Sequence, residues 1–107
     1  PQFRELKLLH EICRALPYKT TMFPNILGHR NQIESQLELD TFTPLLKLEC
    51  SKYLRQFLCI AYLPTCSQLG AVPPCRELCE KARQSFMKVM SKFGATWPEN
   101  LSCVKFP

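Results

Sequence analysis

The sequence predicts one mainly helical domain over residues 1–107, held together by disulfide bonds and carrying no more than a short β element. The first observation is a set of apolar residues spaced three and four apart between positions 54 and 62, which is typical of the buried face of a helix. The second is a similar stripe over positions 78–93. The third is the presence of seven cysteines in 107 residues, a density typical of small secreted domains.

The first thirty residues predict little helix. Residues 1–13 mix apolar and charged side chains in a pattern that fits a strand or a helix, and we favour a short strand that leads into Cys13. Residues 17–28 contain prolines, Asn25 and Gly28, a composition typical of a loop. We therefore expect this part of the chain to be attached to a helical core that lies later in the sequence.

A capping-box pattern marks the first helix. Asn31 is followed three residues later by Glu34, which predicts a helix start, with Ile33 and Leu37 facing the core. Pro44 interrupts this helix, because proline is tolerated in the first turn of a helix but not in its interior. We therefore expect a short second helix to begin directly at this point.

Two longer amphipathic helices form the expected core. Ser51 is a suitable cap for the first of them, and Pro64 ends it. Residues 67–72 then predict a loop, Pro73-Pro74 begins the last long helix, and Gly94 suits its C-terminal end. The two buried faces would consist of Leu54, Phe57, Leu58, Ala61 and Tyr62 in the first helix, and of Leu78, Ala82, Phe86, Val89, Met90 and Phe93 in the second.

The charge of the chain favours acidic partners. The net charge is +5, from 14 basic and 9 acidic residues, and it is too diffuse to indicate nucleic-acid binding. On the last helix, Arg83, Lys88 and Lys92 could contact a sulfated glycan such as heparan sulfate, and the plainer alternative is a solvated basic face. The longest apolar run, residues 57–63, is too short to span a membrane.

Catalytic and metal chemistry fit the sequence poorly. Cys75 and Cys79 have a spacing that zinc sites use, but no second matching pair accompanies them. A nucleophilic Cys–His pair would need a cysteine beside His10 or His29 and a third group to orient it, and both histidines lie in segments that we interpret as surface. We therefore expect no enzyme, no metal site and no cofactor.

Six motifs together resemble the frizzled-type cysteine-rich domain. They follow in that family's order and spacing and cover almost the whole chain: Cys13…Leu16-Pro17-Tyr18, Pro24-Asn25…Gly28-His29, Phe57-Leu58-Cys59, Pro64-x-Cys66, Pro74-Cys75-Arg76-x-x-Cys79-Glu80 and Phe93-Gly94-x-x-Trp97-Pro98…Cys103. The resemblance implies the frizzled cysteine-rich fold and an extracellular location, either at the cell surface or after secretion. It also implies binding to Wnt proteins that carry a palmitoleoyl chain.

The resemblance implies two disulfides, Cys13–Cys59 and Cys79–Cys103. The three remaining cysteines lack their family partners, because Glu5 and Phe86 stand where two of those partners would fall and the third would lie beyond Pro107. The three are Cys50, Cys66 and Cys75. The Phe86 ring could pack near Cys50 in place of a bridge, and a rewired pair among the three is the alternative. Since seven is odd, at least one cysteine must be free or paired with another chain.

Carried over from the family, an apolar groove for an acyl chain would lie between the segment around Phe42 and the last long helix. Its walls would be Phe42, Thr43, Pro44, Leu48, Val89, Met90, Phe93 and Ala95. A second contact with the ligand would involve Leu69 and Val72. The helical pattern alone favours a plainer interpretation, in which Val89, Met90 and Phe93 belong to the core. Asn100 begins an Asn-Leu-Ser sequon, which makes it a candidate glycosylation site.

The preferred function is the capture of a lipidated Wnt protein, by a Wnt receptor or by a secreted antagonist. One alternative is a frizzled-like module of another protein that binds a free fatty acid or a sterol. Another is a domain that serves only protein interaction or spacing. A second copy of the domain is a further candidate partner, joined through a free thiol or a shared acyl chain.

Overall fold

The computed structural model describes residues 6–7, 13, 16–18, 20–47, 52–68 and 70–107. In chain order the helices are α1 (Gln32–Leu39), η2 (Asp40–Phe42), α2 (Thr43–Lys47), α3 (Lys52–Tyr62), α4 (Arg76–Met90), η3 (Ser91–Phe93), η4 (Glu99–Leu101) and η5 (Cys103–Lys105), where η denotes a 3-10 helix. The strands are β1 (Leu6–Lys7), β2 (Thr20–Thr21), β3 (Thr65–Ser67) and β4 (Gly70–Val72). The predicted mainly helical, disulfide-stabilised fold is confirmed.

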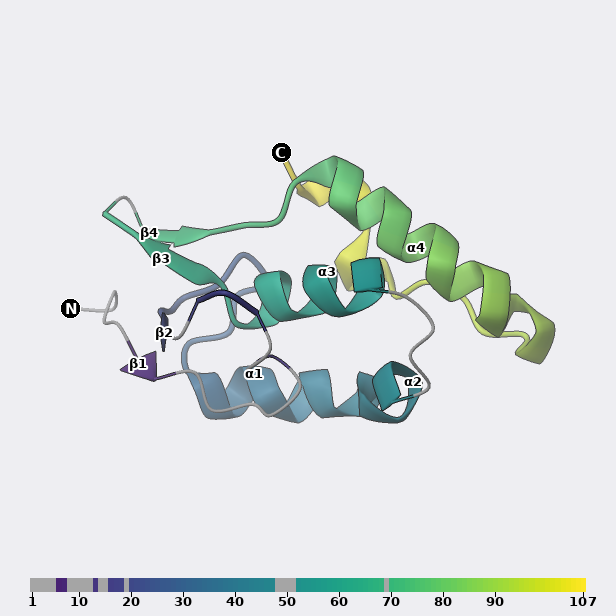
Figure 1. The fold of residues 1–107 in the computed structure, drawn as a ribbon, viewed down its shortest axis with the longest axis horizontal. Helices are drawn as coiled ribbons and strands as arrows, with labels where there is room; N and C mark the ends of the chain where they lie inside the picture. Colours follow the sequence, from purple (N-terminus) through teal and green to yellow (C-terminus); the bar gives the residue numbers. More distant parts are fainter. Residues whose placement is uncertain (1–5, 8–12, 14–15, 19, 48–51, 69) are drawn as a thin grey trace.

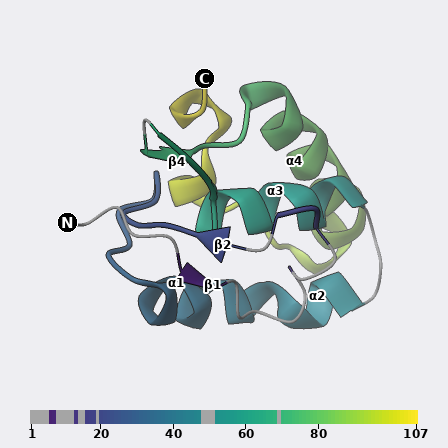
Figure 2. The same cartoon turned by 60° about the vertical axis from the view of Figure 1, so that its left-hand side comes forward.

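Helix α3 lies in the middle of the molecule. In Figures 1 and 2, α1 and α2 run along one side of it and α4 along the other. The predicted inward face of α3 is confirmed, since Leu54, Phe57, Leu58, Ala61 and Tyr62 are all buried. The aromatic core continues beyond this helix, because the Phe57 ring packs edge-on against Phe106 at 5.2 Å and lies 5.8 Å from Trp97.

The N-terminal segment is fastened to the end of α3. The Cys13–Cys59 disulfide joins the two, with a separation of 46 residues along the chain. The hydroxyl of Tyr18 donates to the Leu63 carbonyl at 2.6 Å, and burial raises the pKa of Tyr18 well above its ordinary value. Thr21 adds a third tie by donating to the Pro64 carbonyl at 2.7 Å. These contacts hold a segment with little regular structure of its own.

The strands form two small antiparallel pairs at the same end of the molecule (Figure 1). β1 pairs with β2 through Leu6–Thr21 and Lys7–Thr20. β1 lies within residues 1–13, where a short strand was expected. β3 pairs with β4 through Thr65–Val72, Cys66–Ala71 and Ser67–Gly70. The prediction of a plain loop over residues 67–72 is therefore wrong. Gly70, with a φ of 120°, allows the chain to turn back here.

The start of α1 was predicted correctly, but its inward face was not. Asn31 caps the helix by accepting from the Glu34 amide at 2.8 Å. Ile33 and Leu37, which we expected to face the core, are 72% and 69% exposed. The buried residues of α1 are Gln32, Ser35 and Leu39.

A buried polar cluster explains this orientation of α1. The Ser35 hydroxyl donates to the carbonyl of Tyr62 at 2.6 Å, and the amide of Asn25 donates to the same carbonyl at 2.9 Å. Leaving this carbonyl at the end of α3 buried without a donor would cost about 1–3 kcal/mol. The polar side of α1 therefore turns inward, and its apolar pair turns toward solvent.

Helix α4 begins later than the prolines at 73 and 74 predict. Cys75 is its N-cap, and the Cys75 sulfur accepts from the Leu78 amide at 3.4 Å. The helical path ends at Gly94, whose φ of 76° is left-handed, as the sequence predicts. The chain then returns along α4, and the Cys79–Cys103 disulfide closes this return.

The cysteines outside the two disulfides carry free thiols where the structure describes them. Cys66 is half-buried in β3 and Cys75 is exposed, so these two are not paired with each other. Cys50 lies outside the described residues. Phe86 is 6% exposed, and its ring packs edge-on against Trp97 at 5.3 Å, so it fills the core.

Candidate ligand-binding surface

The first wall of the candidate acyl groove comes from η2 and the start of α2. Phe42 is half-buried, with its ring 6.2 Å from that of Tyr62, and Pro44 is exposed beside it. Thr43 is half-buried, and within the described part of the chain its enclosed hydroxyl has no hydrogen-bond partner. Leu48 lies outside the described residues. This wall thus presents one aromatic ring anchored on the core and one proline ring open to solvent.

The second wall comes from the end of α4 and the turn after it. Val89 and Met90 are half-buried, and the amide of Ala95 donates to the carbonyl of Met90 at 3.2 Å, which folds the turn back on the helix. Phe93 is 76% exposed, the most for a large apolar side chain in this helical stripe. The interpretation of the whole stripe as core is therefore wrong for Phe93, whose ring faces water.

The two walls meet the same hydrophobic core. Phe42, Met90 and Ala95 all pack against the hydrophobic core that surrounds α3. In Figure 1, α2 and the C-terminal end of α4 lie toward the same end of the molecule. Pro44 and Phe93 extend beyond this cluster to the surface. Phe42, Met90 and Ala95 are thus anchored on the core, whereas Pro44 and Phe93 are open to solvent.

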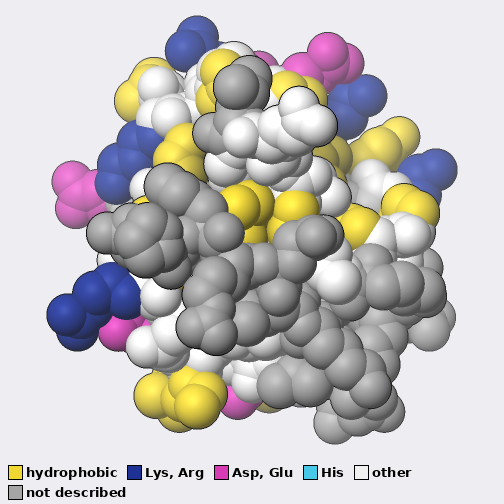
Figure 3. Space-filling view, turned by 90° about the vertical axis from the view of Figure 1, so that its left-hand side faces the viewer, with side chains coloured by type: hydrophobic (Ala, Val, Ile, Leu, Met, Phe, Trp, Pro, Cys, Tyr) yellow, Lys and Arg dark blue, Asp and Glu magenta, His cyan; other side chains and the backbone are white. Residues whose placement is uncertain are grey.

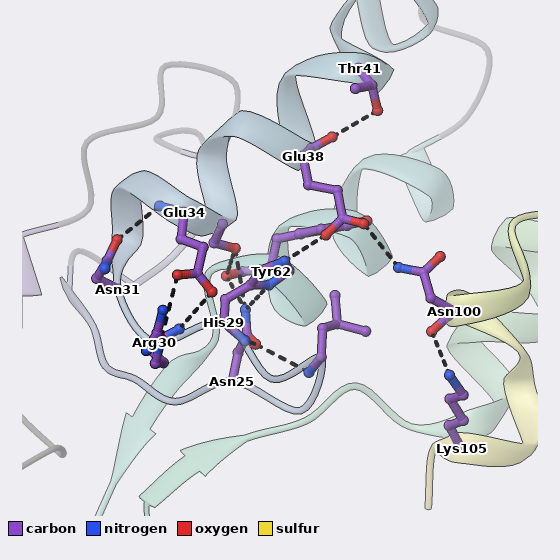
Figure 4. A network of polar contacts seen from close by, with 12 residues as sticks. Asn25, His29, Arg30, Asn31, Glu34, Glu38, Thr41, Tyr62, Asn100 and Lys105 are labelled. Carbon is purple, nitrogen blue, oxygen red and sulfur yellow. Dashed lines mark hydrogen bonds and ion pairs between the residues drawn. The ribbon is translucent and has the colours of Figure 1, made fainter.

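A polar network surrounds Tyr62 (Figure 4). Asn25 is its buried centre, since its side-chain oxygen accepts from the Leu27 and His29 amides at 3.1 and 2.9 Å. The His29 ring stacks on Tyr62 and pairs through Nε2 with Glu38. The network therefore fixes the position of Tyr62, on which the Phe42 ring rests.

Tyr62 stays uncharged in this setting. Burial and the nearby carboxylate of Glu38 raise the pKa of Tyr62 well above its ordinary value. The second oxygen of Glu38 accepts from the side-chain amide of Asn100 at 3.1 Å. This amide nitrogen is the atom to which a glycan would be attached, so glycosylation of Asn100, which stays a prediction, would leave it one N–H instead of two beside Glu38.

The region of the second predicted contact is the β3–β4 hairpin. Val72 is 38% exposed at the end of β4, and Leu69 lies outside the described residues. Figure 3 views the end of the molecule where this hairpin lies and shows apolar side chains there among lysines and arginines. The hairpin lies at the opposite end from the two walls in Figure 1, so a ligand contacting both would have to extend along the molecule.

Sequence reasoning missed a hollow of about 440 Å³ between α4 and the returning chain. Its lining residues are Glu80, Arg83, Trp97, Pro98, Glu99, Ser102, Cys103 and Val104. The available signal was Pro98 soon after Gly94, because a proline after the end of a helix favours a turn, and a chain that returns along a helix leaves a hollow beside it.

Comparison with known proteins gives the family of this chain. The model of the Fz domain matches residues 6–107. The chain belongs to the Fz domain family. This Fz domain is 50% identical over 97 residues to Frizzled-1 of Xenopus laevis, a match that covers 90% of this chain and 17% of Frizzled-1. The Fz domain of Frizzled receptors is an extracellular ligand-binding domain and not an enzyme.

Two solved structures of the Smoothened cysteine-rich domain are similar to this Fz domain. One matches with a TM-score of 0.68 and 26% identity, over 100% of this chain and 95% of that chain. The other, the Xenopus domain in complex with cyclopamine, matches with a TM-score of 0.68 and 27% identity, over 99% of this chain and 96% of that chain. Within the described residues no helix is long and apolar enough to cross a membrane, and no cluster of three metal-binding side chains occurs.

Proposed function

We propose that this Fz domain captures a lipidated Wnt protein by binding its acyl chain, as part of a Wnt receptor or of a secreted antagonist. The kinship with Frizzled-1 supports Wnt as the kind of partner. The observation that carries the proposal is the 76% exposure of Phe93 at the end of a stripe in which Ala82 and Phe86 are buried and Val89 and Met90 are half-buried. Phe93 together with the half-buried apolar side chains beside it supports the proposal of a ligand-covered surface, because contiguous exposed apolar patches often mark such sites.

The energetics of an acyl chain fit an open apolar surface. Each methylene group removed from water contributes about 0.8 kcal/mol, so a partly covered chain supplies several kcal/mol without any polar contact. Met90 and Phe93 suit such a ligand, because a flexible thioether and an aromatic ring adapt to a chain with many conformations. The acyl chain would lie across Phe42, Pro44, Met90 and Phe93.

An aspartate at position 93 should weaken binding of an acylated Wnt protein at least about tenfold, because a carboxylate is costly to desolvate under a hydrocarbon chain. Phe93 is the better probe than Phe42, because Phe42 packs on Tyr62 and its replacement would also disturb the fold. The measurement is the dissociation constant of wild-type and Phe93→Asp domains for an acylated Wnt and for the same Wnt without its acyl chain.

Ile33→Asp is the matched control, since Ile33 is 72% exposed on α1 and lies outside both walls. It should leave the dissociation constant within about twofold, as exposed substitutions remote from a contact usually do. Equal binding of both Wnt forms, or equal losses in the two variants, would contradict the proposal.

A second candidate function is the binding of a free fatty acid or a sterol. It is favoured by the similarity to the Xenopus Smoothened domain that was solved in complex with cyclopamine. Binding of a free sixteen-carbon fatty acid or a sterol, with no affinity for either Wnt form, would support this function instead. A stoichiometry of one acyl chain to two domains in the same experiment would identify a second copy as a partner.

A further inference from the structure

Three lysines lie along one side of α4 and η3. Lys81, Lys88 and Lys92 are spaced seven and four residues apart, which places them on one helix face. At a rise of 1.5 Å per residue, and somewhat more in the 3-10 turn, they span about 17 Å. All three side chains are exposed. Arg83, which the sequence suggested as part of this face, lies about 140° around the helix from Lys88 and lines the hollow instead.

The start of α3 extends this face with a fourth ammonium group. Lys52 and Lys81 both place Nζ over the Tyr53 ring, at 5.4 and 5.1 Å from its centre. The negative face of the ring attracts a cation, which places both ammonium groups near Tyr53. We call Lys52, Lys81, Lys88 and Lys92 the lysine row.

The lysine row is poorly neutralised by the rest of the described chain. Within the described residues, the side chains of Lys88 and Lys92 make no hydrogen bond or ion pair. Lys81 pairs with one exposed carboxylate, that of Glu77, at 3.4 Å. Helix α3 contains no acidic residue. The acidic residues Glu34, Glu38 and Asp40 lie on α1 and η2, on the other side of α3 (Figure 2). Two further carboxylates, those of Glu80 and Glu99, lie on the α4 side among the residues that line the hollow, so the positive field of the lysine row is carried mainly by Lys88 and Lys92.

We propose that the lysine row binds a sulfated glycan. Four ammonium groups along an open face, without an enclosed pocket, match a polymer with repeated anionic groups better than a single small anion. An anionic membrane is a poorer match, since the Fz domains of Frizzled receptors are extracellular whereas anionic phospholipids concentrate in the cytoplasmic leaflet. This inference does not depend on acyl-chain binding, because the lysine row and the Phe42 wall are formed by different residues.

The test measures binding of the purified domain to a size-defined heparin octasaccharide at near-physiological salt. The variant combines Lys81→Gln, Lys88→Gln and Lys92→Gln, which keeps good helix formers in place. Its affinity should fall about tenfold or more, because a focused positive field raises local ligand concentration by such factors. Raising the salt concentration should also lower the affinity of the wild-type domain for the octasaccharide.

The control variant removes the same net charge elsewhere, with Arg30→Gln, Arg83→Gln and Lys105→Gln. These three side chains are exposed and lie outside the lysine row. The affinity of the control variant for the octasaccharide should stay within about threefold of the wild-type value, because screened charges remote from a contact contribute little. Thermal unfolding of both variants checks that each is folded.

Three results would overturn the inference. Equal losses in the two variants would mean that net charge, and not the lysine row, attracts the glycan. Equal binding of heparin and of chemically desulfated heparin would exclude the sulfate groups as the recognised feature. Binding to phosphatidylserine vesicles without binding to heparin would identify a membrane surface instead.

Discussion

Removal of the Cys13–Cys59 disulfide should lower the free energy of unfolding of this Fz domain by about 4 kcal/mol. The bridge closes a segment of 46 residues and joins the N-terminal part of the chain to α3. Without it, the unfolded chain gains the freedom of a long open loop, and two buried sulfur atoms are lost from the core. The measurement is urea unfolding of a Cys13→Ala, Cys59→Ala double variant under non-reducing conditions.

Cys75→Ser is the control for this experiment. Cys75 is an exposed free thiol that caps α4, and serine also caps helices well. The free energy of unfolding should therefore change by less than about 0.5 kcal/mol. A loss below about 1 kcal/mol in the double variant would show that the contacts of Tyr18 and Thr21 hold the N-terminal segment without the bridge.

Replacement of Phe57 by alanine should cost about 3–5 kcal/mol of stability, the range for emptying a buried aromatic site. Phe57 is fully buried on α3, and its ring touches two elements that come much later in the chain, through Phe106 and Trp97. The cavity would thus separate α3 from the returning C-terminal segment. Urea unfolding of Phe57→Ala gives the value.

Phe57→Leu is the matched variant, because leucine keeps much of the volume and loses only the ring contacts. Its cost should be clearly smaller, about 1–2 kcal/mol. Equal costs for the alanine and leucine variants would mean that the aromatic contacts to Trp97 and Phe106, and not the filled volume, stabilise this part of the core.

The helices of this domain could be predicted from sequence where apolar spacing and burial agree. In α3 every residue of the predicted stripe is buried. In α1, apolar spacing did not identify the buried face. Ile33 and Leu37 are the apolar pair of that helix, yet the partner of α1 is a carbonyl at the end of α3, which Ser35 satisfies. Only the tertiary structure places that carbonyl there.

The hairpin was missed for a related reason. The segment from Thr65 to Val72 contains small residues with no alternation of apolar and polar types, so it matched a loop. Its pairing is backbone hydrogen bonding, which depends little on side chains, and Gly70 supplies the turn geometry. Such a short hairpin leaves almost no trace in the sequence.

The candidate site could be predicted only through the family resemblance. Periodicity placed Phe93 in the buried stripe of the last helix, because position 93 continues the spacing of Phe86 and Met90. The helix tightens into η3 after Met90, and Phe93 lies in this last turn with 76% of its side chain exposed. A switch from an α-helix to a 3-10 turn is not visible in the apolar spacing. The exposure of Phe93 therefore emerged from the structure alone.

The most direct test of acyl-chain binding is photo-crosslinking with a sixteen-carbon fatty acid that carries a diazirine near the middle of its chain. After irradiation of the folded domain, the labelled peptides are located by mass spectrometry. If the acyl chain lies between the two walls, label should concentrate on residues 42–44 and 89–95. Label on residues 97–104, which line the hollow, or on residues 33–37 of α1 would contradict the proposed site.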